Sequence, residues 1–341
     1  MITVTYHSDL KEVQSDPHLA ALLGEGARSA PFDRLAWLQG LEVHCGLAPL
    51  LAVARDGPHR AVLALTARDG RLEALANWYS FWTRPMVSPG ANADALLAAL
   101  AADLAKRSGR LSLHGLPGED GSVERLARAF RRSGWLAFSV ACGRNHILNL
   151  NGRGYAEYLA ARPGPLRTTL KRKAAKVACT IHTRFDAEAW AAYEAIYAES
   201  WKPEEGSPAF LRAFAETEGA AGRLRLGVAH VRDEADGEAV AAQFWTVEGG
   251  TAFIHKLAHR EAAKPLSPGT SLSAALFEHV IDRDRVETID FGTGDDGYKR
   301  DWMEEVRLRY RLDLFRPARP ANWPALAKRA FSRLAASANR G

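Results

Sequence analysis

Residues 289–302 read Ile289-Asp290-Phe291-Gly292-Thr293-Gly294-Asp295-Asp296-Gly297-Tyr298-Lys299-Arg300-Asp301-Trp302. The apolar start predicts a short buried strand over 288–291, followed by a Gly-rich acidic loop and a short helix over 298–305. Two adjacent aspartates would repel a pyrophosphate, so the loop is not a dinucleotide-binding turn, and it lacks the ligand spacing of an EF-hand. A Tyr and a Lys directly after a strand-end loop indicate a functional site, with a solvated turn as the alternative.

A second candidate site lies upstream, at the end of another predicted strand. His255-Lys256-Leu257 closes a strand over 251–257, and Leu266-Ser267-Pro268-Gly269-Thr270-Ser271-Leu272 leads into a helix over 270–281. The backbone N–H groups of a helix N-terminus are unpaired, and glycine lets a ligand come close, so this loop can bind an anion. Simple capping of the helix by Ser-Pro-Gly is the alternative.

The same order of elements is predicted twice along the chain. Three strands open near residue 48 and again near residue 224, a long helix begins near 91 and 269, and the next strand begins near 110 and 286. The offsets are all about 176–178 residues, although the letters hardly match. We predict an α/β (α+β) fold of two tandem halves, each a mixed, mostly antiparallel sheet flanked by helices. A single mixed sheet with coincidental spacing is the alternative.

The composition is that of an ordinary soluble protein, but its positive charge is concentrated in two segments. Of 341 residues, 47% are hydrophobic and 25% charged, and the formal net charge is +5. Residues 158–185 hold seven Lys or Arg and no acid, and residues 316–341 hold six and no acid. Two such patches favour local anionic partners. The predicted divisions are an N-terminal half over 1–150, a basic linker helix over 151–177, a C-terminal half over 178–315 and a basic amphipathic tail over 316–341.

Taken together, these motifs resemble the GNAT acyltransferase superfamily, and within it the FemAB-like branch that includes proteins of cellulose and exopolysaccharide gene clusters. The resemblance rests on the strand–hairpin–strand order, Ser-Pro-Gly-Thr at a helix start, and Asp-Phe-Gly-x-Gly-Asp-Asp-x-Tyr-Lys-x-x-Trp over 290–302. That branch pairs two GNAT-like halves, and the basic run over 166–173 also looks like it. The likeness covers most of residues 165–315, and residues 1–150 by element order only.

The resemblance implies acyl transfer from a thioester to an amine. In that superfamily the donor's pantetheine arm pairs with a splayed strand, and its pyrophosphate lies on the N-terminus of the following helix. The residues that the resemblance assigns to the donor are Lys256, Leu257, Pro268, Gly269, Thr270 and Ser271, with Arg167 and Arg172 from the basic run. The loop departs from the usual Q/R-x-x-G-x-G/A pattern. That leaves open whether acyl-CoA, an acyl carrier protein or an aminoacyl-tRNA is the donor.

Several residues are candidates for the chemistry itself. Tyr298 falls where the superfamily often has a tyrosine that protonates the leaving thiolate, which a phenol can do. His255, which titrates near neutral pH, is one candidate for the base that takes a proton from the attacking ammonium, and Asp295 and Asp290 are the other choices. Lys299 can pair with an aspartate of the loop or hold a carboxylate or phosphate of the substrate.

Aromatic residues indicate where a substrate could lie. Trp78, Tyr79 and Trp82 follow a strand of the first half, and Trp201 lies in a similar loop of the second half. Packing between the two halves is an equal alternative for the first group. Asp290 is assigned to the same substrate site. The three cysteines and the histidines lack ligand spacing, so we expect no metal and no disulfide scaffold.

We therefore expect a cytoplasmic N-acyltransferase that uses acyl-CoA or acyl-acyl carrier protein as co-substrate. The expected acceptor is a primary amine of an envelope-related substrate: an amino sugar, a peptide or a long-chain amino lipid. The alternatives are aminoacyl transfer from aminoacyl-tRNA and a non-catalytic protein that binds polysaccharide or lipid precursors. Nucleic acid is not otherwise expected as a partner.

The C-terminal tail has the pattern of a basic amphipathic helix. Trp323, Leu326, Ala330, Phe331 and Leu334 fall at helical spacing on one face, with basic residues on the other. This pattern is typical of a segment on an anionic membrane surface, which would place the protein at the inner face of the cytoplasmic membrane. Packing of the apolar face on the protein's own sheet is the alternative.

Overall fold

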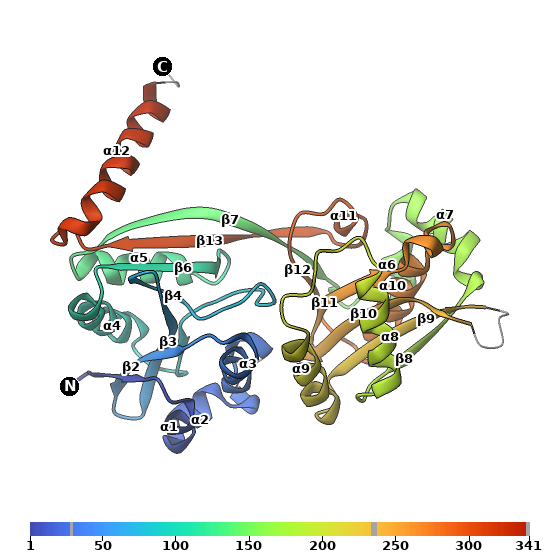
Figure 1. Cartoon of the computed structure of the whole chain (residues 1–341), viewed down its shortest axis with the longest axis horizontal. Helices are drawn as coiled ribbons and strands as arrows, with labels where there is room; N and C mark the ends of the chain where they lie inside the picture. The colour runs from blue at the N-terminus through green and yellow to red at the C-terminus, as the bar shows by residue number, and fades with distance from the viewer. Residues whose placement is uncertain (28–29, 233–236, 339–341) are drawn as a thin grey trace.

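The computed structural model describes residues 1–27, 30–232 and 237–338, and its centre is one continuous β-sheet (Figure 1). The strand order is β1-β2-β3-β4-β6-β13-β7-β12-β11-β10-β9-β8, with β5 paired to β3. The bounds are β1 Thr3–His7, β2 Pro49–Asp56, β3 His59–Arg68, β4 Arg71–Ala74, β5 Met86–Val87, β6 Arg110–Pro117, β7 Leu136–Asn149, β8 Val177–His182, β9 Leu224–Val231, β10 Ala239–Glu248, β11 Thr251–His259, β12 Thr288–Thr293 and β13 Glu305–Phe315.

The neighbouring strands run antiparallel except in two parallel pairs, β4 with β6 and β11 with β12. These pairs occupy corresponding places in the two halves of the chain. The predicted α/β class, with two halves and a mostly antiparallel sheet, is therefore confirmed.

Helices cover both faces of the sheet. Their bounds are α1 Leu10–Ser15, α2 Pro17–Leu23, α3 Leu35–Cys45, α4 Ala93–Arg107, α5 Ser122–Arg132, α6 Tyr155–Ala160, α7 Gly164–Lys173, α8 Ala187–Ala198, α9 Pro208–Ala220, α10 Pro268–Glu278, α11 Lys299–Trp302 and α12 Trp323–Ala338. On one face, α1–α3 and α8–α9 enclose a core to which both lobes contribute. On the other face, α4 and α5 cover a core of the first lobe, and α6, α7 and α10 a core of the second. Alternation along each strand explains this division: Leu51 and Val53 face the shared core, whereas Ala52 and Ala54 face the opposite one.

Two long central strands join the lobes, and neither belongs to one lobe alone. β13, the last strand of the chain, lies between β6 of the first lobe and β7. The end of β7 pairs in turn with β12 of the second lobe, as in Thr288 opposite Asn149. Figure 1 shows β7 and β13 running across the molecule from one lobe to the other. Only the end of β7 is predicted as a strand from the sequence, over 146–150, whereas the strand begins ten residues earlier, at Leu136.

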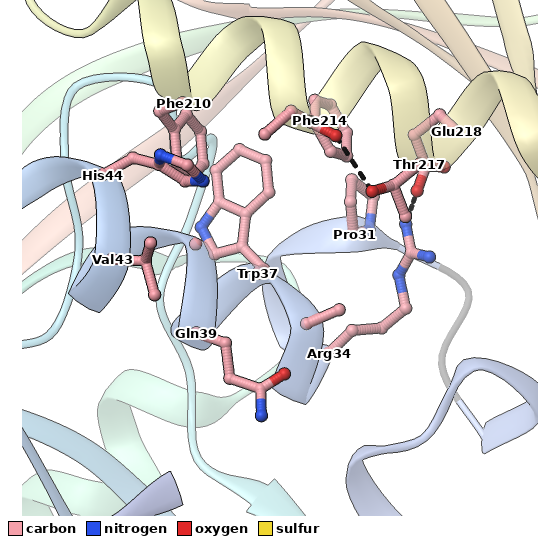
Figure 2. A pocket seen from close by; sticks show the side chains of 13 residues that line it. Pro31, Arg34, Trp37, Gln39, Val43, His44, Phe210, Phe214, Thr217 and Glu218 are labelled. Atoms are coloured by element: carbon pink, nitrogen blue, oxygen red, sulfur yellow. Dashed lines mark hydrogen bonds and ion pairs between the residues drawn. The ribbon is translucent and has the colours of Figure 1, made fainter.

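The lobes also meet through a contact between α3 and α9, beside a cavity of about 280 Å³ (Figure 2). The Trp37 ring packs edge-on against Phe210 and Phe214, with centroids 4.8 and 5.0 Å away. Below them, Arg34 Nη2 donates to Glu218 Oε1 at 3.0 Å in a buried ion pair. Apolar packing and this buried ion pair therefore hold the two lobes in one orientation at this junction.

The basic tail forms the predicted helix, α12, and Figure 1 shows it extending away from the sheet. Its side chains are described as far as Ala330. Arg329 pairs with Asp313 of β13 and lies over the rings of Phe138 and Phe315, so the first turns are anchored to the sheet. Asn322, just before the helix, donates to the Gly109 carbonyl at 2.7 Å. Within the described ranges, no helix is long and apolar enough to cross a membrane.

Candidate active site

The second lobe opens between its two parallel strands. β11 and β12 pair only where Thr251–Phe253 meets Thr288–Asp290, and then they separate. On the other side of β11, the register with β10 shifts between Phe244 and Trp245, so that His255 is an extra residue in a β-bulge. The backbone of β11 after Phe253 is therefore unpaired on its β12 side, and it forms the wall of an opening.

Two adjoining cavities fill this opening. The first, called the α10 cavity, has about 240 Å³ and is lined by Trp201, Leu257, His259, Lys264, Ser267, Pro268, Gly269, Thr270, Ser273, Tyr298 and Trp302. The second, called the β11 cavity, has about 330 Å³ and is lined by Trp78, Tyr79, Phe81, Tyr197, Trp201, Lys202, Pro203, Ile254, His255, Lys256, Leu257, Phe291, Gly292, Thr293, Asp296, Tyr298 and Lys299. Trp201, Leu257 and Tyr298 line both, so they mark the junction.

The N-terminus of α10 faces the α10 cavity without a side-chain cap. Ser267 adopts a left-handed conformation, with φ of +53°, and turns the chain into the helix at Pro268. The N–H groups of Gly269 and Thr270 are in the first turn, where no carbonyl precedes them in the helix. Gln243 holds this turn from β10 through its Nε2, which donates to Gly269 O at 3.0 Å and to Ser273 Oγ at 2.7 Å. The loop that the sequence predicts to bind an anion thus leads into a helix start without a side-chain cap, which Gln243 holds in place from β10.

The basic run forms α7, which packs beside α10. Its last residue, Lys173, reaches the loop, and its Nζ donates to Ser267 Oγ at 3.1 Å. Arg167 and Arg172 are exposed on the same helix and line neither cavity, and Arg167 Nε donates to Arg162 O at 3.0 Å. Ser271 Oγ donates a hydrogen bond to Ser267 O at 3.3 Å, in the first turn of α10. Sequence reasoning identified the basic run but not that Lys173, rather than its neighbours, contacts the loop.

Tyr298 lies at the junction of the cavities, as its place after the Gly-rich loop allows. Its ring packs edge-on against Phe291 at 5.7 Å between centroids. Burial raises the pKa of Tyr298 above its ordinary value, with the Asp296 carboxylate adding to the effect. The phenol is therefore protonated at neutral pH and can donate a proton into either cavity.

Lys299 organises the Gly-rich loop from inside. Its side chain is buried, and its Nζ donates to Phe291 O at 3.1 Å and to Thr293 O at 2.6 Å. Burial lowers the pKa of Lys299, an effect that Asp296 opposes. The ammonium keeps one N–H unused by these two carbonyls and lines the β11 cavity.

Two of the candidate bases lie in environments that weaken them. His255 lines the β11 cavity, but burial lowers its pKa to about 3, and its Nε2 is 2.8 Å from Thr246 Oγ1. Asp295 lines neither cavity: Arg300, Arg144 and His146 surround it, and Arg300 is the main cause that lowers its pKa to about 2. Asp296, its neighbour, lines the β11 cavity instead. Asp295 therefore lies among cations and Asp296 at the β11 cavity, although the two are adjacent in the chain. The sequence does not show this difference.

Lys256 is enclosed by aromatic rings rather than directed at the α10 cavity. Its Nζ lies 4.1 Å from the Trp78 ring centroid and 4.6 Å from that of Tyr79, and it pairs with Glu205 Oε1 at 2.9 Å. Tyr79 OH donates to the same carboxylate oxygen at 2.5 Å. Glu205 is a buried partner that sequence reasoning missed.

Trp82 and Asp290 lie elsewhere, at a separate cavity of about 220 Å³ near the lobe junction. Trp82 Nε1 donates to Asp33 Oδ1 at 3.3 Å. Asp290 accepts from Asn145 Nδ2 at 2.9 Å and from Gly292 N at 2.8 Å, and burial raises its pKa to about 6. The structure therefore brings Trp78, Tyr79 and Trp201 to the β11 cavity, but not Trp82 or Asp290.

The corresponding opening of the first lobe is filled by the chain itself. β4 and β6 pair only at Leu72–Glu73 and then separate. Thr83 enters this gap, where its N–H donates to Gly115 O at 3.0 Å. At the start of α4, the Asn92 side chain accepts from Ala95 N at 3.1 Å and caps the helix. Ser88-Pro89-Gly90 before α4 has the same residues as Ser267-Pro268-Gly269 at the start of α10. The Asn92 side chain nevertheless caps α4, whereas α10 has no side-chain cap.

Residues 159–300 match the model of the acetyltransferase (GNAT) domain, a range that includes α7, the α10 loop and Tyr298. Over these residues the second lobe is similar to a GNAT domain. The separation of its parallel strands β11 and β12 and the start of α10 correspond to the splayed strand and the helix N-terminus that the resemblance implies. No curated protein matches the sequence.

Solved structures share the two-lobed fold of this chain. FemX is similar with a TM-score of 0.60 and 11% identity, over 91% of this chain and 96% of that one. L-PGS from Bacillus licheniformis is similar with a TM-score of 0.57 and 14% identity, over 94% and 96%. A tandem GNAT protein from the clavulanic acid biosynthesis pathway has a TM-score of 0.54 and 15% identity, over 92% and 98%. These likenesses support the FemAB-like arrangement of two GNAT halves as a fold.

Proposed function

We propose that the protein is an N-acyltransferase that moves an acyl group from acyl-CoA, or from an acyl carrier protein, to a primary amine. The GNAT domain supports acyl or aminoacyl transfer in general. The observation that carries the finer proposal is the opening between β11 and β12, with a free helix N-terminus at one end and Tyr298 between its two cavities.

The charge of the α10 cavity suits the phosphates of the donor. A pantetheine arm has amide groups that can pair with the unpaired backbone edge of β11 after Phe253. Its phosphates would meet the N–H groups of Gly269 and Thr270 at the positive end of the α10 dipole. Lys173 and Lys264 add positive charge beside this turn. The thioester would then lie near Tyr298, where the cavities join.

The proposed reaction is direct attack. The amine nitrogen, in its neutral form, forms a bond to the thioester carbonyl carbon from the β11 cavity, and the C–S bond then breaks. Tyr298 gives its proton to the departing thiolate and regains one from solvent after the thiol has left. Asp296 is the carboxylate that lines this cavity, and it is the candidate to take up the amine proton during attack.

The envelope-related acceptor remains part of the proposal, and α12 supports it. The helix carries Lys328 and Arg329 and extends from the sheet, with Trp323 59% exposed at its start. A basic helix with an exposed Trp can rest on an anionic membrane, where an amino lipid would be met. This would place the protein at the inner face of the cytoplasmic membrane.

Calorimetry with CoA and an acyl-transfer assay test the proposed function. We expect CoA to bind the full-length protein, and acetyl-CoA to release thiol in the presence of an amine panel. A folded protein that binds neither CoA nor acyl carrier protein would overturn the proposal.

Aminoacyl transfer from aminoacyl-tRNA is the second candidate, because Lys171, Arg172 and Lys176 are exposed beside the donor loop. Binding of tRNA that weakens steeply with salt, without CoA binding, would favour it.

A further inference from the structure

The β11 cavity holds more positive than negative charge. Lys202, Lys256 and Lys299 line it, and Asp296 is the carboxylate among the lining residues. Glu205 adds a second carboxylate from behind, through its ion pair with Lys256. Three ammonium groups thus face two carboxylates in a partly buried space, where charges are poorly screened.

Two of the three lysines are already engaged. Lys256 is paired with Glu205 and enclosed by aromatic rings, and it is 9% exposed. Lys299 uses two of its three N–H groups on the carbonyls of Phe291 and Thr293. These contacts fix both side chains, so neither can turn away from the cavity.

Lys202 is the lysine without such a partner. Within the part of the chain that the structure describes, its Nζ forms no ion pair or hydrogen bond and lies 5.6 Å from the Trp201 ring centroid. Burial lowers its pKa to about 8, and the charges of Lys256 and Lys299 add to the effect. A buried cation that repels its neighbours is stabilised when an anion binds beside it.

We propose, on the basis of the acyl transfer inferred above, that the acceptor is an amine that also carries a carboxylate or phosphate. Lys202 holds this anionic group, and the remaining N–H of Lys299 contributes a second hydrogen bond. The amine then lies between these lysines and the thioester at Tyr298.

This arrangement also bears on how the amine loses its proton. An ammonium group close to Lys202 and Lys299 is destabilised by like charge, so its pKa falls and the neutral, nucleophilic form is favoured. The anionic group offsets the repulsion and keeps the molecule bound. The cavity can therefore work although His255 and Asp295 are weak bases.

The test uses matched pairs of acceptors with acetyl-CoA and the full-length protein. β-Alanine is compared with ethylamine, and glucosamine 6-phosphate with glucosamine, by kcat/KM for thiol release. We expect the anionic member of at least one pair to be better by about 10- to 100-fold, the usual effect of a charge-assisted hydrogen bond. Which pair responds distinguishes a carboxylate from a phosphate.

Two variants identify the residue that acts. Lys202→Gln should bring the ratio within the responding pair close to one, while the KM for acetyl-CoA stays the same. Lys106→Gln is the matched control, because it removes one exposed lysine charge from α4 in the other lobe and should leave the ratio unchanged. Equal kcat/KM within both pairs, or an unchanged ratio in Lys202→Gln, would overturn the inference.

The pH dependence gives an independent readout. The preference should fall between pH 7 and pH 9, because Lys202 loses its charge around its pKa of about 8. The charged groups that face it are Lys256 on β11, Lys299 on α11, Asp296 before α11 and Glu205 before α9. A preference that is constant over this range contradicts the role of Lys202.

Failure of the proposed function would be seen separately. If no amine releases thiol, calorimetry of the donor-free protein with glucosamine 6-phosphate and with β-alanine still decides the inference. Binding that Lys202→Gln abolishes supports an anion site at the β11 cavity, and absence of binding by both probes refutes it.

Discussion

At the scale of single residues, burial and hydrogen bonding assign different tasks to neighbours in the Gly-rich loop. Lys299 donates to two backbone carbonyls, Asp295 is surrounded by cations, and Tyr298 lines both cavities. Because its pKa is raised, the Tyr298 phenol stays protonated at neutral pH, and its proton is available to a thiolate that forms beside it.

Tyr298→Phe should therefore lower kcat for acyl transfer by roughly 10²–10⁴-fold with little effect on the KM for acyl-CoA. The ring and its contact with Phe291 remain, so the change removes only the proton donor. Tyr155→Phe, on α6 and away from both cavities, is the matched control and should keep full activity. A loss under about threefold in the chemical step would make Tyr298 a packing residue.

Asp290 supplies a prediction about stability and pH. Burial raises its pKa to about 6 in the folded chain, above the value of 3.8 for a free side chain. The folded state thus holds the proton more tightly, so its contribution to stability is full below pH 4 and is lost as the pH rises through 6. The free energy of unfolding of the wild type relative to Asp290→Asn should fall by about 3 kcal/mol over this window. Urea unfolding at several pH values measures it, and a difference that does not change with pH would contradict it.

At the scale of elements, the two helix starts show how one motif serves two purposes. Ser-Pro-Gly lies just before α4 and at the start of α10. Asn92 caps α4, whereas α10 begins at Pro268, inside the motif, without a side-chain cap. Thr83 closes the strand gap next to α4, and nothing of this kind is seen between β11 and β12 in the described residues. The free N–H groups of α10 are the reason for proposing the second lobe as the donor side.

Gly269→Glu should abolish CoA binding in calorimetry while leaving the fold intact. A Cβ at this position would meet His259 Nδ1 at 3.5 Å, an ordinary contact, so the effect comes from the carboxylate among the phosphate-binding N–H groups. Ala93→Glu puts the same charge at the capped start of α4 and should not change CoA affinity. Unchanged binding in a folded Gly269→Glu protein would remove the donor assignment.

Helix α12 yields a second prediction at this scale. The full-length chain should sediment with vesicles that contain anionic lipid, and a chain that ends at Ala330 should bind them less. The cut leaves Asn322 and Arg329 in place, which anchor the start of the helix to the sheet, so the fold should be preserved. Vesicles of neutral lipid are the control. Equal sedimentation of both chains would assign α12 a role other than membrane binding.

At the scale of the whole molecule, the shared strands make the two lobes one unit. β13 pairs with β6 on one side and β7 on the other, so neither lobe has a complete sheet without the other's strand. The aromatic contact between α3 and α9 adds a core to which both lobes contribute.

The protein should therefore unfold in urea in a single transition, although its length would allow two domains. Tryptophan fluorescence reports on both lobes, because Trp37 and Trp190 lie in the shared core but come from different lobes. Its unfolding midpoint should therefore equal the midpoint measured by circular dichroism. A variant that weakens the contact, Phe210→Ala, should shift both signals together. Two separate midpoints would show that the lobes are independent domains.

The sequence determined the order of elements, the internal repeat and the positions of the α10 loop and Tyr298. These depend on local patterns: alternation, helical spacing, and Gly or Pro at turns, which act within a few residues. The helix of the tail, which starts at Trp323, also follows from such spacing.

Only the tertiary structure decided which of these local features carry chemistry. The pairing of β7 with β13 joins residues more than 150 positions apart in the chain. The closure of the first lobe likewise depends on a non-local contact, between Thr83 and Gly115. His255 and Asp295 become weak bases, Asp290 and Trp82 lie at another cavity, and Lys202, Lys256 and Glu205 converge, because burial and charge depend on neighbours in space. The pKa of a side chain and the shape of a cavity depend on residues that are close in space, and these neighbours cannot be read from a single sequence.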